Sequence, residues 1–286
     1  PQNTVEEPPL EVEIKTVQTF KGDERPIAVM IDNHKAALPQ GGLNNAYMVY
    51  EIIVEGGESR LMALFKGQNL EKIGPVRSSR HYFLDYALEN DAIYVHFGWS
   101  PQAEYDISNL KVNNINGISE SSSSFWRTKD KSAPHNVATS TQKILEIAKR
   151  KDYATTSTKK SVLNYVVDDV KLENGEKADE ITIPYSDSNV VKYTYDSDTG
   201  RYQRYSKGIE ETDWTTKEKV TEAESAADDY AEDNEDNQYE EYNYDNEEYN
   251  NDYADEAPAE EQNDVQEEAP AEGDPDAGCL DAPQIW

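Results

Sequence analysis

The segment at residues 74–80, Gly-Pro-Val-Arg-Ser-Ser-Arg, carries the residue types that suit the binding of an anion. Arg77 and Arg80 provide two guanidiniums, and a helix is predicted to begin directly after them. The first turn of a helix leaves backbone N–H groups unsatisfied and carries about half a positive charge, so it attracts phosphate or carboxylate. Ser78 or Ser79 is expected to act as the N-cap of this helix, and both serines, with Asn136 further along the chain, are predicted to take part in ligand binding.

A second interpretation gives the same arginines no ligand. Arg77 and Arg80 would then be surface side chains paired with the acids Asp85, Glu89 or Asp91 further along the chain. Exposed ion pairs of this kind are common, and each contributes at most about 1 kcal/mol. Both interpretations stay open at the level of sequence.

Further residues that could do chemistry are predicted to reach one edge of a sheet. Asp32 follows one apolar run, Arg60 begins another and His96 ends a third. Open α/β sheets usually bind ligands where their strands end, and arginines grip phosphoryl groups through bidentate hydrogen bonds. Asp32 or Glu51 would then hold a divalent cation such as Mg²⁺, which prefers hard oxygen ligands. The alternative for Asp32 is a structural ion pair with Arg77.

His135 and Asn136 lie in the Ala-Pro-His-Asn stretch at residues 133–136, just before a predicted helix. An imidazole there could donate to an anion or exchange protons near neutral pH. The alternative is a structural loop in which Asn136 satisfies a turn, and His96 is likewise typical of a buried core histidine. The sequence has no Gly-x-Ser-x-Gly elbow, no Gly-rich phosphate loop with its Lys and no His-Glu-x-x-His motif. It therefore indicates no particular enzymatic reaction.

The elements that must position these residues alternate between strands and helices. Short apolar runs, two of them joined by a Gly-Gly turn at residues 56–57, predict strands. Apolar residues spaced by three and four predict helices, with capping signals at Ser100 and at Thr139 with Gln142. Expected strands are residues 26–31, 47–54, 59–65, 73–76, 92–97 and 112–118; expected helices are residues 82–90, 101–110 and the segment after 139. This pattern predicts an α/β fold with a mixed sheet covered by helices.

Four regions are predicted along the chain. Residues 1–20 form an extended tether and residues 21–156 the α/β domain. Strand-like runs at 162–167, 181–183, 190–195 and 201–205 predict a small β-rich appendage at residues 157–221. Residues 222–286 form an acidic, tyrosine-rich tail that is expected to be disordered, because it has too little apolar surface to offset the entropy of ordering.

The charge of −31 is concentrated in the predicted tail. Residues 222–286 carry 25 of the 58 acidic residues and no Lys, Arg or His, so the preceding 221 residues have a net charge of only −6. Nucleic acid is not an expected partner, because no basic stripe is present to neutralise phosphates. Cys279 is the only cysteine, so neither an intrachain disulfide nor a cysteine-built metal site is expected. No apolar run is long enough to span a membrane, and the start at Pro1 is compatible with removal of a leader.

Several motifs together resemble the YerB-like bacterial lipoproteins, a family of unassigned biochemical function. They are Arg-Pro-Ile-Ala-Val-Met-Ile-Asp-Asn at 25–33, Val-Tyr-Glu at 49–51, Val-Glu-Gly-Gly at 54–57, Lys-Ile-Gly-Pro-Val-Arg-Ser-Ser-Arg at 72–80, Ile-Tyr-Val-His at 93–96 and Ala-Pro-His-Asn at 133–136. The resemblance covers about residues 25–153. Residues 190–221 resemble only the start of the family's β-rich C-terminal part, after which this chain becomes acidic and of low complexity.

The resemblance implies an extracytoplasmic protein held at the membrane only through an N-terminal lipid. A more distant similarity in layout, from Glu51 to Arg80, links the chain to the LytR-CpsA-Psr phosphotransferases, which use arginines to grip a lipid pyrophosphate. We therefore expect a module that binds an anionic ligand, such as a phosphoryl or uronic group of a cell-wall precursor. The alternatives are a metal-assisted phosphotransferase acting on lipid-linked pyrophosphate with Mg²⁺, and an adaptor that binds an envelope protein without a small ligand.

Overall fold

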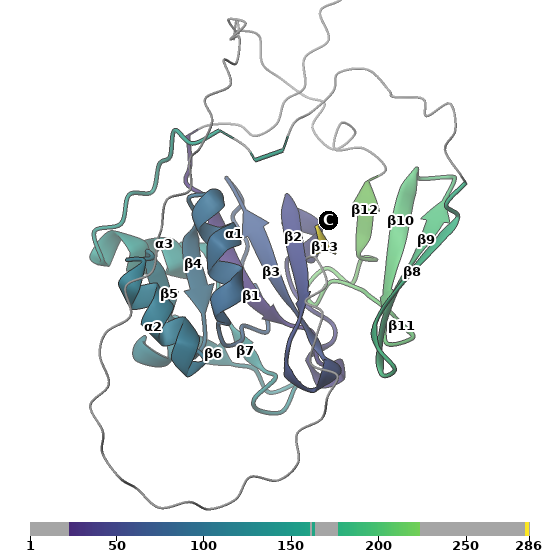
Figure 1. The fold of residues 1–286 in the computed structure, drawn as a ribbon, viewed down its shortest axis with the longest axis horizontal. Helices are drawn as coiled ribbons and strands as arrows, with labels where there is room; N and C mark the ends of the chain where they lie inside the picture. Colours follow the sequence, from purple (N-terminus) through teal and green to yellow (C-terminus); the bar gives the residue numbers. More distant parts are fainter. Residues whose placement is uncertain (1–22, 161, 164–176, 224–283, 286) are drawn as a thin grey trace, which may run out of the picture. The chain divides into compact units, whose positions relative to one another are not determined.

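The computed structural model describes residues 23–160, 162–163, 177–223 and 284–285 (Figure 1). All of these residues belong to one compact unit of the chain. The predicted tether at residues 1–20 and almost all of the predicted tail at 222–286 lie outside the described residues, as does most of the predicted strand at 162–167.

Six of the described strands form a mixed sheet in the order β13-β2-β3-β1-β4-β5. Their bounds are β1 Ile27–Asp32, β2 Met48–Ile53, β3 Ser59–Phe65, β4 Ile93–His96, β5 Asn114–Asn116 and β13 Gln284–Ile285. The central strand β1 is antiparallel to β3 on one side and parallel to β4 on the other, and β4 is parallel to β5. The predicted mixed sheet is confirmed.

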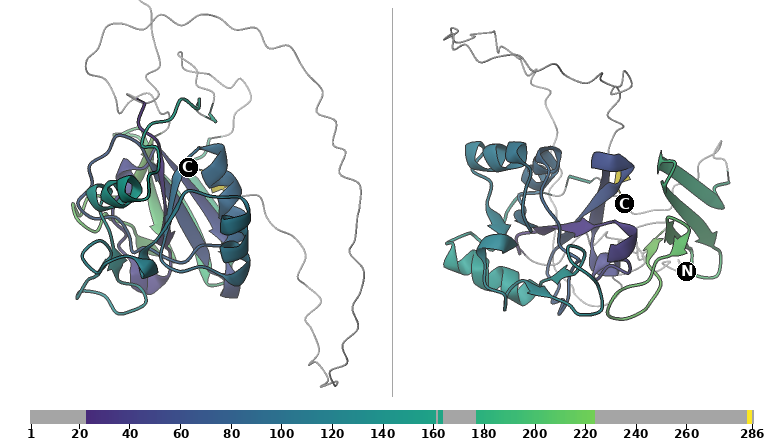
Figure 2. Two further views of the ribbon diagram at one scale, coloured as in Figure 1. Left: turned by 90° about the vertical axis from the view of Figure 1, so that its left-hand side faces the viewer. Right: turned by 90° about the horizontal axis from the view of Figure 1, so that it is seen from below.

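Helices cover both faces of this sheet (Figure 2). They are α1 at Leu84–Glu89, which continues a 3₁₀ turn at His81–Phe83, then α2 at Pro101–Asn109 and α3 at Thr141–Arg150. Because side chains alternate along a strand, Val29 and Ile31 face the core that includes Ile147 of α3. Met30 faces the opposite core, which includes Leu84 of α1. The sheet is therefore the middle layer of three.

A second, antiparallel sheet follows in sequence. Its strands are β8 Glu180–Ser186, β9 Asn189–Asp196, β10 Arg201–Ser206 and β11 Ile209–Glu210, with β12 Thr221–Ala223 paired to β10. The predicted hairpin is present as β9 and β10, and its turn closes where Gly200 N donates to Asp196 O. Gly200 has φ of 66°, a left-handed conformation that glycine adopts without a Cβ clash. A short ribbon, β6 Trp126–Arg127 with β7 Val137–Ala138, completes the described strands.

A buried charge cluster joins the two sheets. Arg204 of β10 is fully buried, and its guanidinium contacts Glu51 of β2 (Nη2 to Oε2, 2.8 Å) and Glu211 after β11. Burial alone would lower the pKa of Arg204, but Glu211 and Glu51 raise it well above its usual value. The second sheet therefore depends on an acid from the first for the neutralisation of its buried cation.

Ser78 and Ser79 do not cap a helix, which corrects the prediction. The 3₁₀ turn and α1 follow Arg80, and the Arg80 side chain makes no capping hydrogen bond. Ser78 Oγ donates to Phe97 O, and Ser79 Oγ accepts from the Tyr94 hydroxyl. Both hydroxyls are thus used in tertiary contacts. With six residues, α1 is also too short to provide the predicted anion-binding helix terminus.

Two further local predictions are wrong. Residues 73–76 do not form a strand but make isolated bridges, among them Ile31 to Val76. Ser140 rather than Thr139 caps α3, because Ser140 Oγ accepts from Lys143 N at 3.3 Å. Thr139 Oγ1 instead donates to Ser124 O at 3.0 Å.

Candidate functional site

Asp32, at the end of β1, is the centre of the candidate site and is 3% exposed. Its Oδ1 accepts from the backbone N–H of His34 at 3.0 Å. Its Oδ2 lies 2.8 Å from His135 Nδ1 and 3.1 Å from Arg77 Nε. A cation and an imidazole from two distant loops therefore meet at one buried carboxylate, and the structural ion pair expected as one alternative for Asp32 is present.

Arg77 reaches Asp32 because its loop is inserted between two parallel strands. Arg77 N donates to Met30 O of β1, and Phe97 N, directly after β4, donates to Arg77 O, each at 2.9 Å. Ser79 N continues the ladder to Gly98 O. The gap between the carboxyl ends of neighbouring parallel strands is where open α/β sheets commonly take a ligand. In this chain its own backbone fills that gap.

His135 stacks on a second histidine that the sequence analysis did not single out. The rings of His135 and His34 lie 4.3 Å apart at 15°. His34 Nδ1 accepts from Ala36 N at 3.0 Å, so Nδ1 carries no proton and Nε2 of the neutral ring does. His34 lies two residues after Asp32, just beyond a predicted strand. This position near the end of a strand was the sequence signal that could have identified it.

The loop that carries His135 is held by Lys131 and Trp214, which sequence reasoning also missed. Lys131 Nζ donates to the carbonyl oxygens of Ala37 and Pro39 and lies 4.1 Å from the centre of the Trp214 indole ring. Burial lowers the pKa of Lys131 to about 8. Trp214 Nε1 donates to Asp130 Oδ2 at 2.7 Å. The segment between β11 and β12 therefore helps to fix the position of the loop that carries His135.

Arg60 on β3 is the direct register partner of Asp32 on β1. It is 7% exposed, and the hydrogen bond that the described residues give its guanidinium is Nη1 to Ser78 O at 2.6 Å. Burial, together with the positive charges of Arg80 and Arg77, lowers the pKa of Arg60 to about 10. Asp32 and Glu55 act in the opposite direction but do not cancel the effect of burial. The cluster of charges around Arg60 therefore holds the three arginines Arg60, Arg77 and Arg80 with these two carboxylates.

The charge of Arg80 is neutralised by the neighbouring carboxylate of Glu55. Its Nε and Nη2 donate to the two carboxylate oxygens of Glu55 at 2.7 and 2.9 Å, and Nη1 donates to Ser79 O. The fork to Glu55 raises the pKa of Arg80 and lowers that of Glu55. The partners of Arg77 and Arg80 are thus Asp32 and Glu55 rather than the acids expected from sequence.

Glu51 does not join Asp32. Its Oε1 accepts from Asn33 Nδ2 and Ser59 Oγ, and its Oε2 accepts from Arg204. Within the described part of the chain, no group of three or more His, Cys, Asp or Glu side chains is arranged to hold a metal ion. The metal role of Asp32 and Glu51 stays a prediction, and the structure places the two carboxylates in separate networks.

Asn136 and His96 are used inside the protein. Asn136 Oδ1 accepts from Arg127 Nη1, and its Nδ2 donates to Thr128 O. His96 is fully buried, with hydrogen bonds to Gly98 O and Asn114 Oδ1, and burial lowers its pKa to about 4. Of the predicted site residues, the structure brings together Asp32, Arg60, Arg77 and His135. It gives Ser78, Ser79, Arg80 and Asn136 other protein partners.

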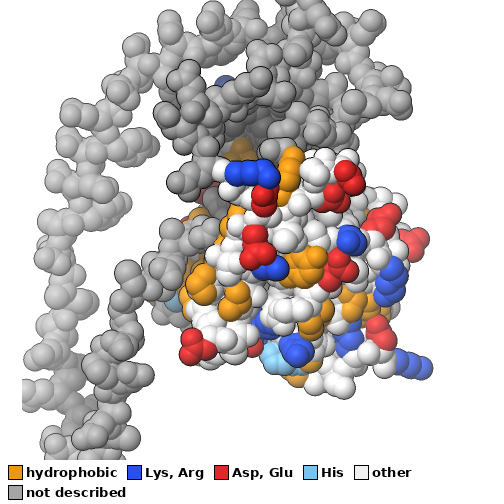
Figure 3. All heavy atoms as spheres, turned by 90° about the vertical axis from the view of Figure 1, so that its right-hand side faces the viewer, with side chains coloured by type: hydrophobic (Ala, Val, Ile, Leu, Met, Phe, Trp, Pro, Cys, Tyr) orange, Lys and Arg blue, Asp and Glu red, His pale blue; other side chains and the backbone are white. Residues whose placement is uncertain are grey.

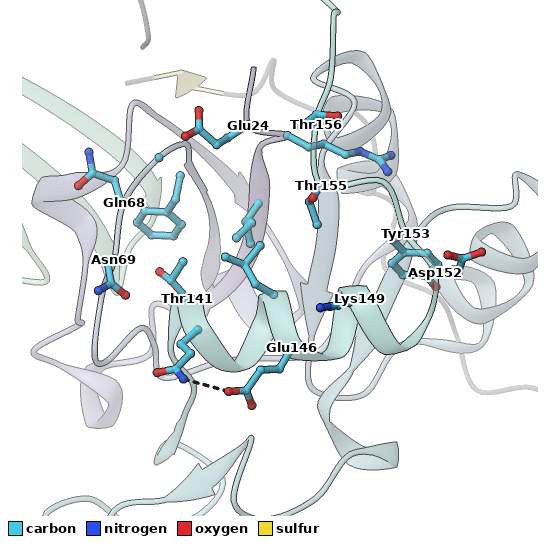
Figure 4. A pocket seen from close by; sticks show the side chains of 16 residues that line it. Glu24, Gln68, Asn69, Thr141, Glu146, Lys149, Asp152, Tyr153, Thr155 and Thr156 are labelled. Carbon is cyan, nitrogen blue, oxygen red and sulfur yellow. Dashed lines mark hydrogen bonds between the residues drawn. The ribbon is translucent and has the colours of Figure 1, made fainter. Parts of the chain in front are cut away.

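Two cavities lined by described residues lie away from this site. The larger, of about 970 Å³, lies between α3, which supplies Thr141 and Lys149, and a rim that includes Glu24 and Thr156 (Figure 4). The smaller, of about 670 Å³, lies beside α2 and β5. Neither is lined by an arginine of the site. Arg77 and His135 therefore line neither of these two cavities.

The face drawn in Figure 3 carries acidic and basic side chains interspersed with one another, with a histidine beside basic side chains at its lower edge. This face has no broad stripe of a single sign. The helices of the described residues include none that is long and apolar enough to cross a membrane.

Residues 15–154 match the family described as protein of unknown function (DUF3048) N-terminal domain. This segment of the chain is a DUF3048 N-terminal domain, and the predicted resemblance to the YerB-like family is confirmed. The chain is 36% identical over 206 residues to "Putative lipoprotein YerB" of Bacillus subtilis (strain 168), which covers 71% of this chain and 61% of YerB. The crystal structure of the YerB protein from Bacillus subtilis aligns with a TM-score of 0.60 at 33% identity, over 69% of this chain and 66% of that one. The chain thus spans less than two thirds of the length of its relative.

Proposed function

We propose that this chain is an extracytoplasmic, lipoprotein-type envelope module that binds an anionic ligand at Arg60, Arg77 and His135. The location is supported by the relative, whose name describes a lipoprotein, and an N-terminal lipid would then hold the protein at the membrane. The ligand is a phosphoryl or similar group, as carried by an anionic cell-wall precursor.

The observation that carries the proposal is the state of the Arg60 guanidinium. A guanidinium has five N–H donors, and buried donors are nearly always satisfied. Arg60 is 7% exposed, and the acceptor that the described residues offer its guanidinium is Ser78 O, which leaves its other N–H groups for solvent or a ligand. Arg77 Nε is also buried without a hydrogen bond of good geometry, although it lies near Asp32. An oxyanion would supply the acceptors that these two side chains lack.

The chemistry of the donors favours a phosphoryl group. Guanidinium forks match the oxygen spacing of phosphate and of carboxylate, and the three arginines Arg60, Arg77 and Arg80 outnumber the two carboxylates Asp32 and Glu55 beside them. A group with more than one negative charge compensates that excess better than a single carboxylate does. Glucuronate and pyrophosphate, as probes, separate these two classes.

The proposal is tested by calorimetric titration of the protein with pyrophosphate, phosphate and glucuronate. We expect pyrophosphate to bind most tightly and its affinity to fall about 10- to 100-fold in Arg60→Gln and in Arg77→Gln, the range for loss of a charge-assisted hydrogen bond. Arg150→Gln is the matched control, because Arg150 is an exposed arginine of α3 paired with Glu120. Thermal melting of each variant separates a loss of binding from a loss of folding.

A second candidate is an adaptor for an envelope protein. It is favoured by the contacts of Arg77 with Asp32 and of Arg80 with Glu55, which give each arginine an acid and an architectural role. If no probe binds the folded protein, or if affinity is the same in Arg60→Gln, Arg77→Gln and Arg150→Gln, the anion site is wrong and the adaptor remains.

A further inference from the structure

We infer that Asp32 and His135 form the proton-accepting element of a site that hydrolyses phosphoesters. This inference rests on the anion site proposed above and adds a reaction to it. The sequence shows no nucleophile motif, so the attacking group is water and the protein supplies the base and the positive charge.

The hydrogen bonds select the tautomer that a base requires. His135 Nδ1 faces the buried carboxylate of Asp32 at 2.8 Å, so Nδ1 carries the proton and Nε2 holds a lone pair. The described residues give Nε2 no hydrogen-bond partner, and the side chain is 16% exposed. In hydrolytic sites, a buried carboxylate commonly binds one nitrogen of a histidine and orients the ring. The other ring nitrogen then stays available to act as the base.

The neighbours of His135 are those that a phosphoester needs. Arg77 shares Asp32 Oδ2 with His135, so a phosphoryl oxygen bound by Arg77 lies beside the imidazole. Arg60, one strand away, has guanidinium donors to which the described residues offer no acceptor besides Ser78 O. The stacked His34 is in the opposite tautomer, because its Nδ1 accepts from Ala36 N and its Nε2 carries the proton. The site therefore combines a lone pair for water with N–H donors for the phosphoryl oxygens.

The step balances with water as the only co-reactant. Water oxygen forms a bond to phosphorus while one water proton moves to His135 Nε2. The bond from phosphorus to the ester oxygen breaks, and the leaving oxygen takes the electron pair. The imidazolium, stabilised by Asp32, then returns its proton to solvent. Arg60 and Arg77 stabilise the charge on the phosphoryl oxygens, and Asp32 acts as a positioning residue.

The role of Asp32 as a positioning residue has its own readout. Asp32 binds His135 Nδ1 and contacts no substrate atom in the proposed step. Asp32→Asn is therefore expected to lower kcat for bis(4-nitrophenyl) phosphate more than it changes KM, whereas a general loss of folded protein would lower the apparent kcat together with the thermal stability.

The test uses bis(4-nitrophenyl) phosphate and 4-nitrophenyl phosphate with EDTA present, release of 4-nitrophenolate as the readout, and pyrophosphate binding measured on the same samples. Turnover is expected in the wild-type protein and is expected to fall about 100-fold in His135→Ala, within the range for loss of a general base. Added imidazole is expected to restore part of it. His81→Ala is the matched control, because His81 is exposed and contacts the Tyr82 ring.

Each outcome separates the two proposals. Binding of pyrophosphate without turnover overturns the hydrolytic role and leaves the anion site standing. Turnover that is equal in His135→Ala and wild type, or that disappears in EDTA, also overturns it. Absence of both binding and turnover in folded protein overturns both proposals.

Discussion

Asp32 and Arg60 face each other across β1 and β3 as register partners, and both are buried. Their alignment is set by the apolar alternation of the two strands, because a slip of one residue would move every side chain to the other face of the sheet. The core thus fixes the separation between the carboxylate that holds His135 and the guanidinium that donates to Ser78 O.

Removal of the buried cation between the sheets should destabilise the protein strongly. Arg204→Met leaves Glu51 and Glu211 buried without their partner, and breaking a buried pair in this way costs about 3–5 kcal/mol. Urea unfolding at pH 7 measures this loss. Lys192→Met, which removes an exposed pair with Glu180, should cost less than about 1 kcal/mol. Similar losses in the two variants would contradict the placement of Arg204.

The buried His96 should make stability depend on pH in mildly acidic solution. Its folded-state pKa is lowered to about 4 by burial, whereas the unfolded chain takes up the proton near pH 6.5. The unfolded state therefore binds more protons between these values, and the free energy of unfolding falls by about 3 kcal/mol as pH drops from 6.5 to 4. This contribution to the pH dependence of the free energy of unfolding should be absent in His96→Gln and retained in His81→Gln. Urea unfolding across the pH range measures it.

Neutralising Glu55 should strengthen anion binding at the proposed site. Glu55→Gln removes the carboxylate that occupies the Arg80 fork. A unit charge about 7 Å from the ligand in a solvent-like medium is worth a few tenths of a kcal/mol, so affinity for pyrophosphate should rise about two- to threefold. The gain should shrink at high salt. Glu71→Gln, at an exposed position, is the control and should leave the affinity unchanged; weaker binding in Glu55→Gln would contradict the expectation.

At the N-terminus of α3, the contributions of the Thr139 and Ser140 hydroxyls to stability can be compared. Ser140→Ala removes the N-cap and should lower the free energy of unfolding by about 1 kcal/mol. Circular dichroism of the variant should show fraying limited to the first turn. Thr139→Ser keeps the hydroxyl that donates to Ser124 O and should have a smaller effect. An unchanged free energy of unfolding in Ser140→Ala would contradict the assignment of Ser140 as the N-cap of α3.

The mixed sheet and its helices could be predicted because their signals are local. The hairpin of β2 and β3 follows from two apolar runs around a Gly-Gly turn, and α2 from a serine cap before a proline. The serine caps at residues 78–79 were predicted wrongly for a physical reason. Their hydroxyls bond to Phe97 O and to Tyr94, whose proximity is created by the fold.

The candidate site could be predicted only in part for the same reason. Residue types indicated Asp32, Arg60, Arg77 and His135, and an ion pair of Asp32 with Arg77 was one of the alternatives. The contact of Asp32 with His135 could not be predicted, because it joins residues 103 positions apart. Arg204 shows the limit most clearly. Its sequence neighbourhood is that of an exposed strand, and its burial follows from an acid 153 residues distant.

The backbone segment wedged between β1 and β4 has a consequence for what this protein can hold. Residues 77–79 bond through their backbone to Met30 and to the segment directly after β4. A ligand in the position that is usual for open α/β sheets would have to displace this segment and break those hydrogen bonds. The occupied crevice therefore leaves side chains outside it, and not the ends of the strands themselves, as the groups that could touch a ligand.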